Sequence, residues 1–236
     1  MLTPKIVHRM TDLFKLCAEI AALPVAVLHF RTRLHPTNIR TVHAYFTKPH
    51  PRYKVFKNKA LGAALVNLGA FATANEFIAS LKRSGDAAAN RKKALARGHR
   101  LCEIDRNALV DAIHEINISC SERQGRPMDS AYLKKQLHYE DLAHYRYYGV
   151  FDRDGTLVAY CNLGVFGNFA STDQLMGFKN NSGVMYFLLA EITCKLIEER
   201  QLEYLMYDTI YGAMPGLRAF KHRLGFQPHR ARYRID

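Results

Sequence analysis

Closely spaced cysteines are absent from this 236-residue sequence, which contains 5 cysteines in all. They stand far apart, at Cys17, Cys102, Cys120, Cys161 and Cys194, and form no CxxC pair or Cys/His cluster. An odd number of scattered cysteines in a chain of this length indicates reduced thiols rather than a disulfide framework. The histidines also lack the spacing of metal ligands. We therefore expect a cytoplasmic protein with no metal site.

Apolar runs long enough to cross a membrane are also absent. The stretch from Leu16 to Phe30 is rich in apolar residues, but it is only about 15 residues long and a span needs roughly 20. It contains Glu19 and is broken by Pro24, and no clear small-residue cleavage site is present. This stretch is predicted to be an ordinary packed helix, with a helix lying on a membrane surface as the alternative.

Acidic residues are scarce in the first 100 positions. Residues 1–100 hold 18 Lys/Arg against 4 Asp/Glu, whereas residues 101–236 hold 16 against 17. The net charge of +13 therefore comes from the first part of the chain. A basic segment attracts polyanions, here tRNA or another nucleic acid, an anionic membrane surface or a phosphorylated cofactor. The alternative is a basic surface that is simply solvated.

Repeats of solenoid length and low-complexity tracts are absent as well. With 48% hydrophobic and 23% charged residues, the chain has the composition of a globular protein that can bury a sizeable core. A helix is predicted over 11–22, followed by a connection that contains Pro36, Pro49 and Pro51. The proline-bounded segment 48–52 predicts a boundary. We expect a basic extension over residues 1–52 and one domain over residues 53–236.

The order of predicted elements indicates an α/β fold. It comprises a strand within 53–68, helices at 76–84, 87–97, 106–119 and 129–137, and strands at 100–104, 145–151, 157–166 and 170–178. A helix over 183–200, a strand over 202–208, a helix from 216 and a strand from 225 follow. The Asp154-Gly155 pair is typical of a hairpin turn. A mixed sheet with helices on both faces is predicted, with strand 202–208 parallel to the strand before helix 183–200.

The segment 180–226 resembles the acyl-donor half of the GNAT acyltransferase superfamily. It contains a polar loop, a helix, an apolar strand, a second helix and a Gly-Phe strand start. GNAT enzymes carry a Q/R-x-x-G-x-G/A loop whose backbone N–H groups hold the cofactor pyrophosphate at a helix start. Gly183 matches the first glycine, whereas Asn180 and Met185 replace the Gln/Arg and the small residue. The resemblance implies a GNAT-like mixed, mostly antiparallel sheet flanked by helices.

Two further features resemble the Fem-type aminoacyltransferases, which share that fold and lack the strict loop. The basic helix ending Lys92-Lys93-Ala94-Leu95-Ala96-Arg97-Gly98 precedes a strand, as their Lys/Arg-rich helix does. The strand Tyr204 to Asp208, followed by Gly216-Leu217-Arg218-Ala219-Phe220-Lys221, is similar to their Y-D…G-L…F-K signature. This resemblance covers roughly residues 75–236 and leaves the first 50 or so without a counterpart.

The resemblance implies a donor site at the start of helix 183–200. Its residues would be Asn180, Asn181, Ser182, Gly183 and Val184, which would bind a phosphate through backbone N–H groups. The implied donor is acyl-CoA, with aminoacyl-tRNA as the alternative. Ser and Asn also cap helices in proteins that bind nothing there, so a plain helix cap is the other interpretation.

The implied reaction centre lies at and just after strand 202–208. Tyr211 is the candidate proton donor to the leaving group, and Asp208 is the candidate acceptor of a proton from the attacking amine. Tyr207 is assigned to substrate binding. Aromatic packing of the tyrosines and a turn-capping role for Asp208 are the alternatives.

Two other places are candidates for substrate binding. Arg123, Gln124 and Arg126 lie in a polar loop that shapes the acceptor pocket in this fold, and two arginines suit a carboxylate or phosphate. A solvent-exposed loop is the alternative. Lys221 is a candidate contact to a donor phosphate, although an exposed helix lysine is the more usual interpretation.

These expectations describe an acyltransferase. An amine from a small molecule or a peptide would attack a bound thioester or ester directly, with the protein supplying positioning and backbone donors. The competing hypothesis is a catalytically silent module of the same fold that binds nucleic acid or an anionic surface through its basic N-terminal part.

Overall fold

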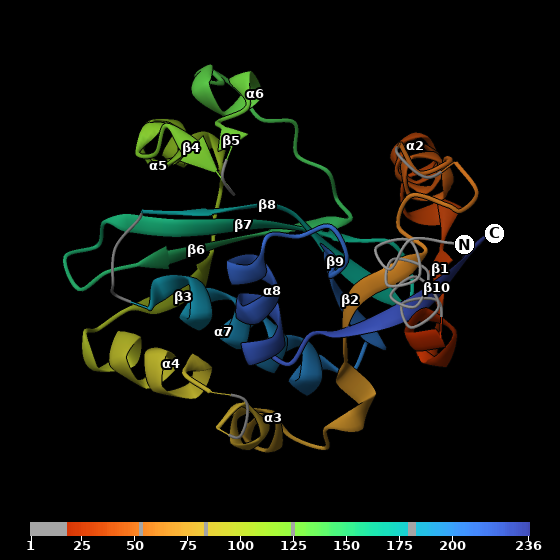
Figure 1. Ribbon diagram of the computed structural model, residues 1–236. Coiled ribbons are helices and arrows are strands. Elements are labelled where there is room, and N and C mark those ends of the chain that lie inside the picture. Colours follow the sequence, from red (N-terminus) through yellow and green to blue (C-terminus); the bar gives the residue numbers. More distant parts are fainter. Residues whose placement is uncertain (1–17, 52–53, 83–84, 124–125, 179–182) are drawn as a thin grey trace, which may run out of the picture.

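The computed structural model of the protein describes residues 18–51, 54–82, 85–123, 126–178 and 183–236 (Figure 1). Eight strands form one sheet in the order β1-β10-β2-β9-β8-β7-β6-β3. They are β1 (Val25–Phe30), β2 (Leu61–Asn67), β3 (Arg100–Glu103), β6 (Tyr145–Phe151), β7 (Leu157–Val165), β8 (Phe169–Gly177), β9 (Tyr204–Thr209) and β10 (Gln227–Ile235). Among these strands, only β1–β10 and β8–β9 pair in parallel. The predicted mixed, mostly antiparallel sheet and its parallel β8–β9 pair are confirmed.

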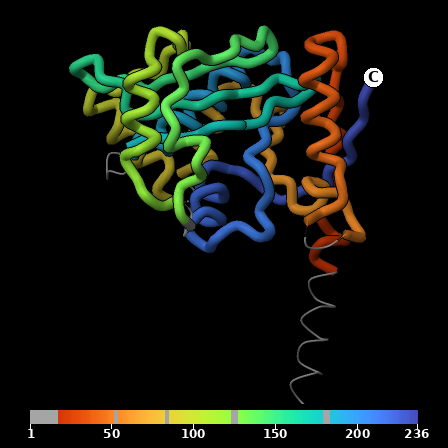
Figure 2. The backbone as a smooth tube through the Cα atoms, turned by 90° about the horizontal axis from the view of Figure 1, so that it is seen from above, coloured from red at the N-terminus to blue at the C-terminus, as the bar shows by residue number. Residues whose placement is uncertain are grey.

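The helices cover both faces of this sheet. They are α2 (Pro36–Thr47), α3 (Ala74–Leu81), α4 (Ala87–Ala96), α5 (Val110–Ile118), α6 (Ser130–Leu133), α7 (Val184–Glu199) and α8 (Pro215–Arg223). In Figure 1, α3, α4, α7 and α8 lie below the sheet, and α2 and α5 lie above it with α6. Figure 2 shows α2 and the α5–α6 segment at opposite ends of that upper face. The short strands β4 (Glu122–Arg123) and β5 (Arg126–Pro127) form a hairpin beside α5.

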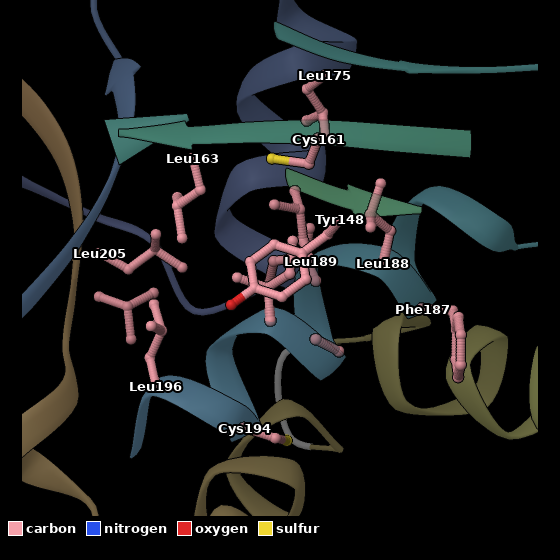
Figure 3. Packing of buried hydrophobic residues seen from close by; sticks show 14 of the residues in the cluster. Tyr148, Cys161, Leu163, Leu175, Phe187, Leu188, Leu189, Cys194, Leu196 and Leu205 are labelled. Carbon is pink, nitrogen blue, oxygen red and sulfur yellow. The ribbon is translucent and has the colours of Figure 1, made fainter. Parts of the chain in front are cut away.

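The core centres on α7. Ten of its 16 residues are buried, because α3 and α4 cover the side of the helix that the sheet does not. In the close view of Figure 3, Leu188 and Leu189 of α7 lie among Tyr148 of β6 and Cys161 and Leu163 of β7. Its apolar residues Leu188, Leu189, Ile192 and Leu196 recur at helical spacing, and the sequence predicted the helix to within one residue at each end.

The apolar stretch from Leu16 to Phe30 was predicted to be one helix, and that prediction was wrong. Among its described residues only 18–22 are helical, and Val25–Phe30 is the strand β1. Pro24 ends the helix, and the valines that follow favour an extended chain. β1 finds its partner at the far end of the sequence, since Val25 pairs with Arg230 and Phe30 with Ile235. No local pattern could reveal that pairing.

The outer edge of β1 is closed by the turn between β7 and β8. The side chain of Asn168 in this turn is 8% exposed. It accepts a hydrogen bond from His29 N at 2.8 Å and donates one to Val27 O at 3.0 Å. Gly167 lies so close to the strand that a Cβ there would be 2.1 Å from His29 O. Part of the segment 1–52 is thus integrated into the sheet, and a domain boundary at residue 52 remains a prediction.

Replacement of Asn168 tests this edge contact. Asn168→Ala removes both side-chain bonds and leaves two β1 backbone groups without their partner. We expect the free energy of unfolding to fall by roughly 1–3 kcal/mol, the usual cost of unpaired buried groups. Denaturant titration measures this change. Asn67→Ala, at an exposed position in β2, is the matched control and should be close to neutral. Equal stability of the two variants would contradict the proposed role.

Candidate functional site

The parallel strands β8 and β9 separate part-way along their length. They pair from Phe169 with Tyr204 as far as Ser171 with Met206. Just beyond this point each strand carries a bulge against its other neighbour. β8 has one extra residue around 173–174 opposite β7, and β9 has one around 207–208 opposite β2. Bulges bend strands and redirect side chains, and they are common beside active sites. Together they open a wedge in the middle of the sheet.

A cavity of about 450 Å³ occupies this wedge. Its walls come from α2, from Lys59 before β2, from the start of β6 and the residue after β7, and from β8 and β9 at and beyond their last pair. The lining residues are Thr41, Val42, Tyr45, Phe46, Lys59, Tyr145, Phe166, Ser171, Thr172, Asp173, Leu175, Met206, Tyr207 and Asp208. The sequence predicted Tyr207 and Asp208 as site residues, and both line this cavity.

The β9 side of the cavity carries an ion pair. Lys59 Nζ lies 2.5 Å from Asp208 Oδ1, and the side chains are 16% and 52% exposed. Asp208 has a φ of +52°, a left-handed conformation that is rare for residues other than glycine and fits its place in the bulge. The ring of Tyr45 on α2 lies beside this pair, 5.5 Å from Lys59 Nζ and 4.5 Å from Lys48 Nζ.

A second lysine lies behind Tyr207 and Asp208. Lys221 is 1% exposed, and it is the only buried residue of α8, all of which is described. Its Nζ donates a hydrogen bond to Thr209 O at 2.8 Å and sits 4.5 Å from the centre of the Tyr207 ring. Burial lowers the pKa of Lys221 to about 8, with Asp208 opposing this shift and Lys59 adding to it. The usual interpretation of Lys221 as an exposed helix lysine was wrong.

Tyr211 occupies a different position from Tyr207. Its ring packs against Gly62, where a Cβ would be only 2.2 Å from the ring edge. Burial raises the pKa of Tyr211, and Glu19 adds to the increase. Tyr211 is not among the residues that line the cavity, whereas Tyr207 is. The role of Tyr211 as a proton donor remains a prediction. Tyr207, which does line the cavity, is the second tyrosine to test for that role.

Asp173 lines the cavity but was not predicted. It lies in the β8 bulge with its side chain open to the cavity. The Asp173 side chain is exposed, but partial shielding of its carboxyl group from water raises the pKa, and Arg106 opposes this shift. The sequence did carry a signal, because four polar residues, Ser171 to Gln174, interrupt an otherwise buried strand. Such an interruption in a central strand indicates either a bulge or a site.

A second hollow, of about 490 Å³, lies at the start of α7. It is lined by Asn90, Lys93, Gly183, Val184, Met185, Tyr186 and Arg223. Gly183 has a φ of +76°, and a Cβ there would be 2.9 Å from the Asn90 side chain and 3.0 Å from its carbonyl oxygen. Free N–H groups and the positive end of the helix dipole at this helix start favour an anion. Arg223 reaches the hollow while pairing with Asp86 at 3.6 Å.

Several predicted site residues lie outside the described residues. They are Asn180, Asn181 and Ser182 before α7 and Gln124 between β4 and β5. For Arg123 and Arg126 the described part is the backbone, which forms the β4–β5 hairpin. The roles assigned to these residues remain predictions, whereas Gly183 and Val184 do line the hollow at the start of α7.

Comparison with known proteins identifies the architecture. No protein-family model and no curated protein matches the sequence. Among solved structures, FemX, a Fem-type aminoacyltransferase, superposes with a TM-score of 0.55 at 10% identity, covering 83% of this chain and 66% of FemX. The chain has the GNAT-like fold. The resemblance inferred from segment 180–226 is thereby confirmed at the level of the fold.

Two other solved structures with similar architecture match less of the chain. The C-terminal domain of a putative lysylphosphatidylglycerol synthetase from Agrobacterium fabrum is 18% identical, with a TM-score of 0.49, and the match covers 70% of this chain and 57% of that one. A tandem GNAT protein from the clavulanic acid biosynthesis pathway is 17% identical, with a TM-score of 0.39. The match covers 56% of this chain and 43% of that protein's chain. The chain thus spans little more than half the length of the synthetase domain.

Two features are missing from the described residues. None of the helices in those ranges is long and apolar enough to cross a membrane. The same ranges contain no group of three or more His, Cys, Asp or Glu side chains arranged to hold a metal ion.

The buried ammonium of Lys221 makes stability depend on pH. Its pKa is about 8 in the folded protein against an ordinary 10.5, so between these values the unfolded chain holds a proton that the folded chain has lost. The free energy of unfolding should therefore rise with pH over this interval, by up to about 3 kcal/mol.

Lys221→Met removes this rise. Denaturant titrations at several pH values measure the free energy of unfolding of both proteins. Above pH 8, we expect this free energy to rise with pH in wild type but not in the variant. Lys92→Met, which alters an exposed lysine of α4, is the control and should follow wild type at every pH. A difference between wild type and Lys221→Met that stays constant with pH would show that Lys221 is not buried as an ammonium.

Proposed function

We propose that the protein transfers an acyl or aminoacyl group from a thioester or ester donor to an amine. The observation that carries this proposal is the buried Lys221 ammonium beside the Lys59–Asp208 pair, at the wedge between β8 and β9 of a GNAT-like fold. A buried lysine destabilises the fold, and strongly perturbed titratable groups beside a cleft concentrate at functional sites. The likeness to FemX supports the same class of reaction.

Lys59 and Lys221 would stabilise the negative charge of the reaction. When the amine nitrogen attacks the carbonyl carbon, negative charge develops on the carbonyl oxygen and then on the leaving sulfur or oxygen. Fixed positive charges that are already in position lower the barrier to such steps. Lys59 lines the cavity and would act directly, whereas Lys221 would act through Tyr207 and the end of β9.

Proton transfers complete the step. Asp208 would take the proton that the attacking amine loses as the new C–N bond forms. A tyrosine hydroxyl would return a proton to the leaving group as its bond to the carbonyl carbon breaks. Tyr211 is the tyrosine predicted for this role, and the cavity position of Tyr207 supports a direct comparison of the two. No covalent intermediate with the protein is needed.

The donor would bind at the hollow before α7. Lys93 and Arg223 line this hollow together with the first residues of α7, and both a coenzyme A pyrophosphate and the phosphates of a tRNA end suit such a site. The donor is therefore acyl-CoA or aminoacyl-tRNA. Asn180, Asn181 and Ser182 would contribute backbone N–H groups, and Arg123, Gln124 and Arg126 would bind the acceptor.

A silent module that binds a polyanion is the alternative. Lys92 and Lys93 on α4 and Arg97 directly after it are exposed, which supports contact with nucleic acid or an anionic surface. Arg91 on the same helix is paired with Glu191 of α7 at 2.5 Å, so its charge is already balanced. Binding of tRNA without transfer of any acyl group would favour this alternative.

Single-turnover measurements with a bound donor test the proposed chemistry. Asp208→Asn should lower the rate of transfer by roughly a hundredfold to ten-thousandfold, the usual contribution of a proton-transfer group. Tyr207→Phe and Tyr211→Phe each remove one hydroxyl, and the variant with the same scale of loss identifies the proton donor. Donor affinity, measured in parallel, should stay near the wild-type value. Rates that remain unchanged in all three variants would exclude this mechanism.

A thermal-shift panel with coenzyme A, acetyl- and long-chain acyl-coenzyme A, and tRNA identifies the donor. The compound that stabilises wild type should stabilise Gly183→Ala much less, because the new Cβ collides with Asn90 at the donor hollow. Gly212→Ala is the matched control, since Gly212 has a similar φ of +83° but no atom within 4 Å of the position that a Cβ would take. Equal stabilisation of both variants by the donor would show that the donor does not bind at this hollow.

A further inference from the structure

The cavity contains two carboxylates in equivalent places. Ser171 and Met206 form the last pair of the parallel strands β8 and β9, and Asp173 and Asp208 each lie two residues further along. Each carboxylate belongs to the bulge of its own strand, and both line the cavity. The wedge therefore has one acidic side chain on each of its two walls.

The two carboxylates differ in the positive charges that lie near them. Asp208 is paired with Lys59, and the ammonium of Lys221 lies close enough to be affected by its charge. Among the described residues, no cation forms an ion pair with Asp173. The β9 wall thus carries the charges of Lys59 and Asp208, with the positive charge of Lys221 behind it. The β8 wall carries a negative charge that no ion pair within the described ranges balances.

Arg106 acts on Asp173 electrostatically, but its guanidinium group is engaged elsewhere. It lies 3.7 Å from the centre of the Tyr147 ring and 4.8 Å from that of Tyr139. It also donates a hydrogen bond to the carbonyl oxygen of Glu140. The Asp173 carboxylate therefore keeps its hydrogen-bonding capacity for a ligand in the cavity.

The surroundings of Asp173 suit a primary ammonium group. Tyr145 lines the same part of the cavity, and Gly164 lets its ring lie close to the sheet, where a Cβ would be 3.0 Å from Tyr145 Cζ. Burial raises the pKa of Tyr145, and the charge of Asp173 raises it further. The hydroxyl of Tyr145 hence stays neutral. An aromatic ring, neutral hydroxyls and a carboxylate that has no ion pair within the described residues attract an ammonium ion.

We propose that Asp173 binds a primary ammonium group of the ligand, so that the cavity selects ligands with a positive charge at the β8 wall. The inference rests on the proposed assignment of this cavity as the acyl-transfer site. The positive β9 wall is the side suited to the carbonyl oxygen and leaving group, so the ammonium at Asp173 is one that does not react. It belongs either to an acceptor with two amines or to the transferred group of an aminoacyl donor.

Calorimetric titrations of the full chain with small probes test the proposal without any turnover. The first pair of probes is 1,5-diaminopentane and neutral 1-pentanol, and the second is alanine methyl ester and neutral methyl propanoate. Wild type should bind the charged member of at least one pair more tightly. Asp173→Asn should then weaken that binding by roughly tenfold or more, the scale of a lost charge-assisted hydrogen bond, and leave the neutral probe unaffected.

The control is Asp154→Asn, which removes an equal charge from the exposed β6–β7 turn and should bind like wild type. Asp173→Ser replaces Asp173→Asn if the latter does not fold. A loss limited to the ester assigns the ammonium to the transferred group, and a loss for the diamine assigns it to the acceptor. The proposal is overturned if wild type prefers neither charged probe, or if the Asp173 variants keep the preference. Because no donor is present, the outcome is independent of whether the protein transfers acyl groups.

Discussion

The early separation of β8 from β9 is the constraint on which the functional part of the structure depends. Two parallel strands would normally continue to pair, and a bulge on each one prevents this beyond Ser171 and Met206. The opening created in the sheet holds a cavity of about 450 Å³, and it lies beyond the third residue of β8 and the third residue of β9. The cavity thus follows from one interruption in hydrogen bonding.

The charges around the opening follow from its position. Lys59, Asp208 and Lys221 come from three separate segments, and only the fold brings them together. Lys221 is held inside by a carbonyl oxygen and an aromatic ring, and within the described part of the chain it forms no ion pair, which leaves its ammonium group incompletely neutralised. The β9 side of the site therefore has a positive potential before any ligand arrives. That property suits a reaction in which negative charge appears on an oxygen or a sulfur.

Much of the fold could be predicted from local pattern, and the site only in part. The meander of β6, β7 and β8 was predicted almost to the residue, because Asp152 and Gly155 set the turn: the Asp152 side chain accepts bonds from Asp154 N and Thr156 N. The structure of the N-terminal segment was not predicted, since the apolar side chains of β1 do not reveal that its partner is β10. Asp173 was missed although Asp208 was found, because the polar run from Ser171 to Gln174 is compatible with an ordinary exposed stretch of strand as well as with a bulge. The burial of Lys221 depends on what α8 packs against, which its own polar composition conceals.

The pairing of β1 with β10 has a consequence for the order in which the protein folds. Arg230 Nε donates a hydrogen bond to Leu23 O across 207 residues of sequence, and the whole parallel pair shares this separation. During synthesis, β1 and the following helix α2 leave the ribosome long before the strand that they need exists. Contacts of such long range form slowly and late, because a very large loop must close first. Since α2 supplies one wall of the cavity, the site is completed only when the last strand has been made.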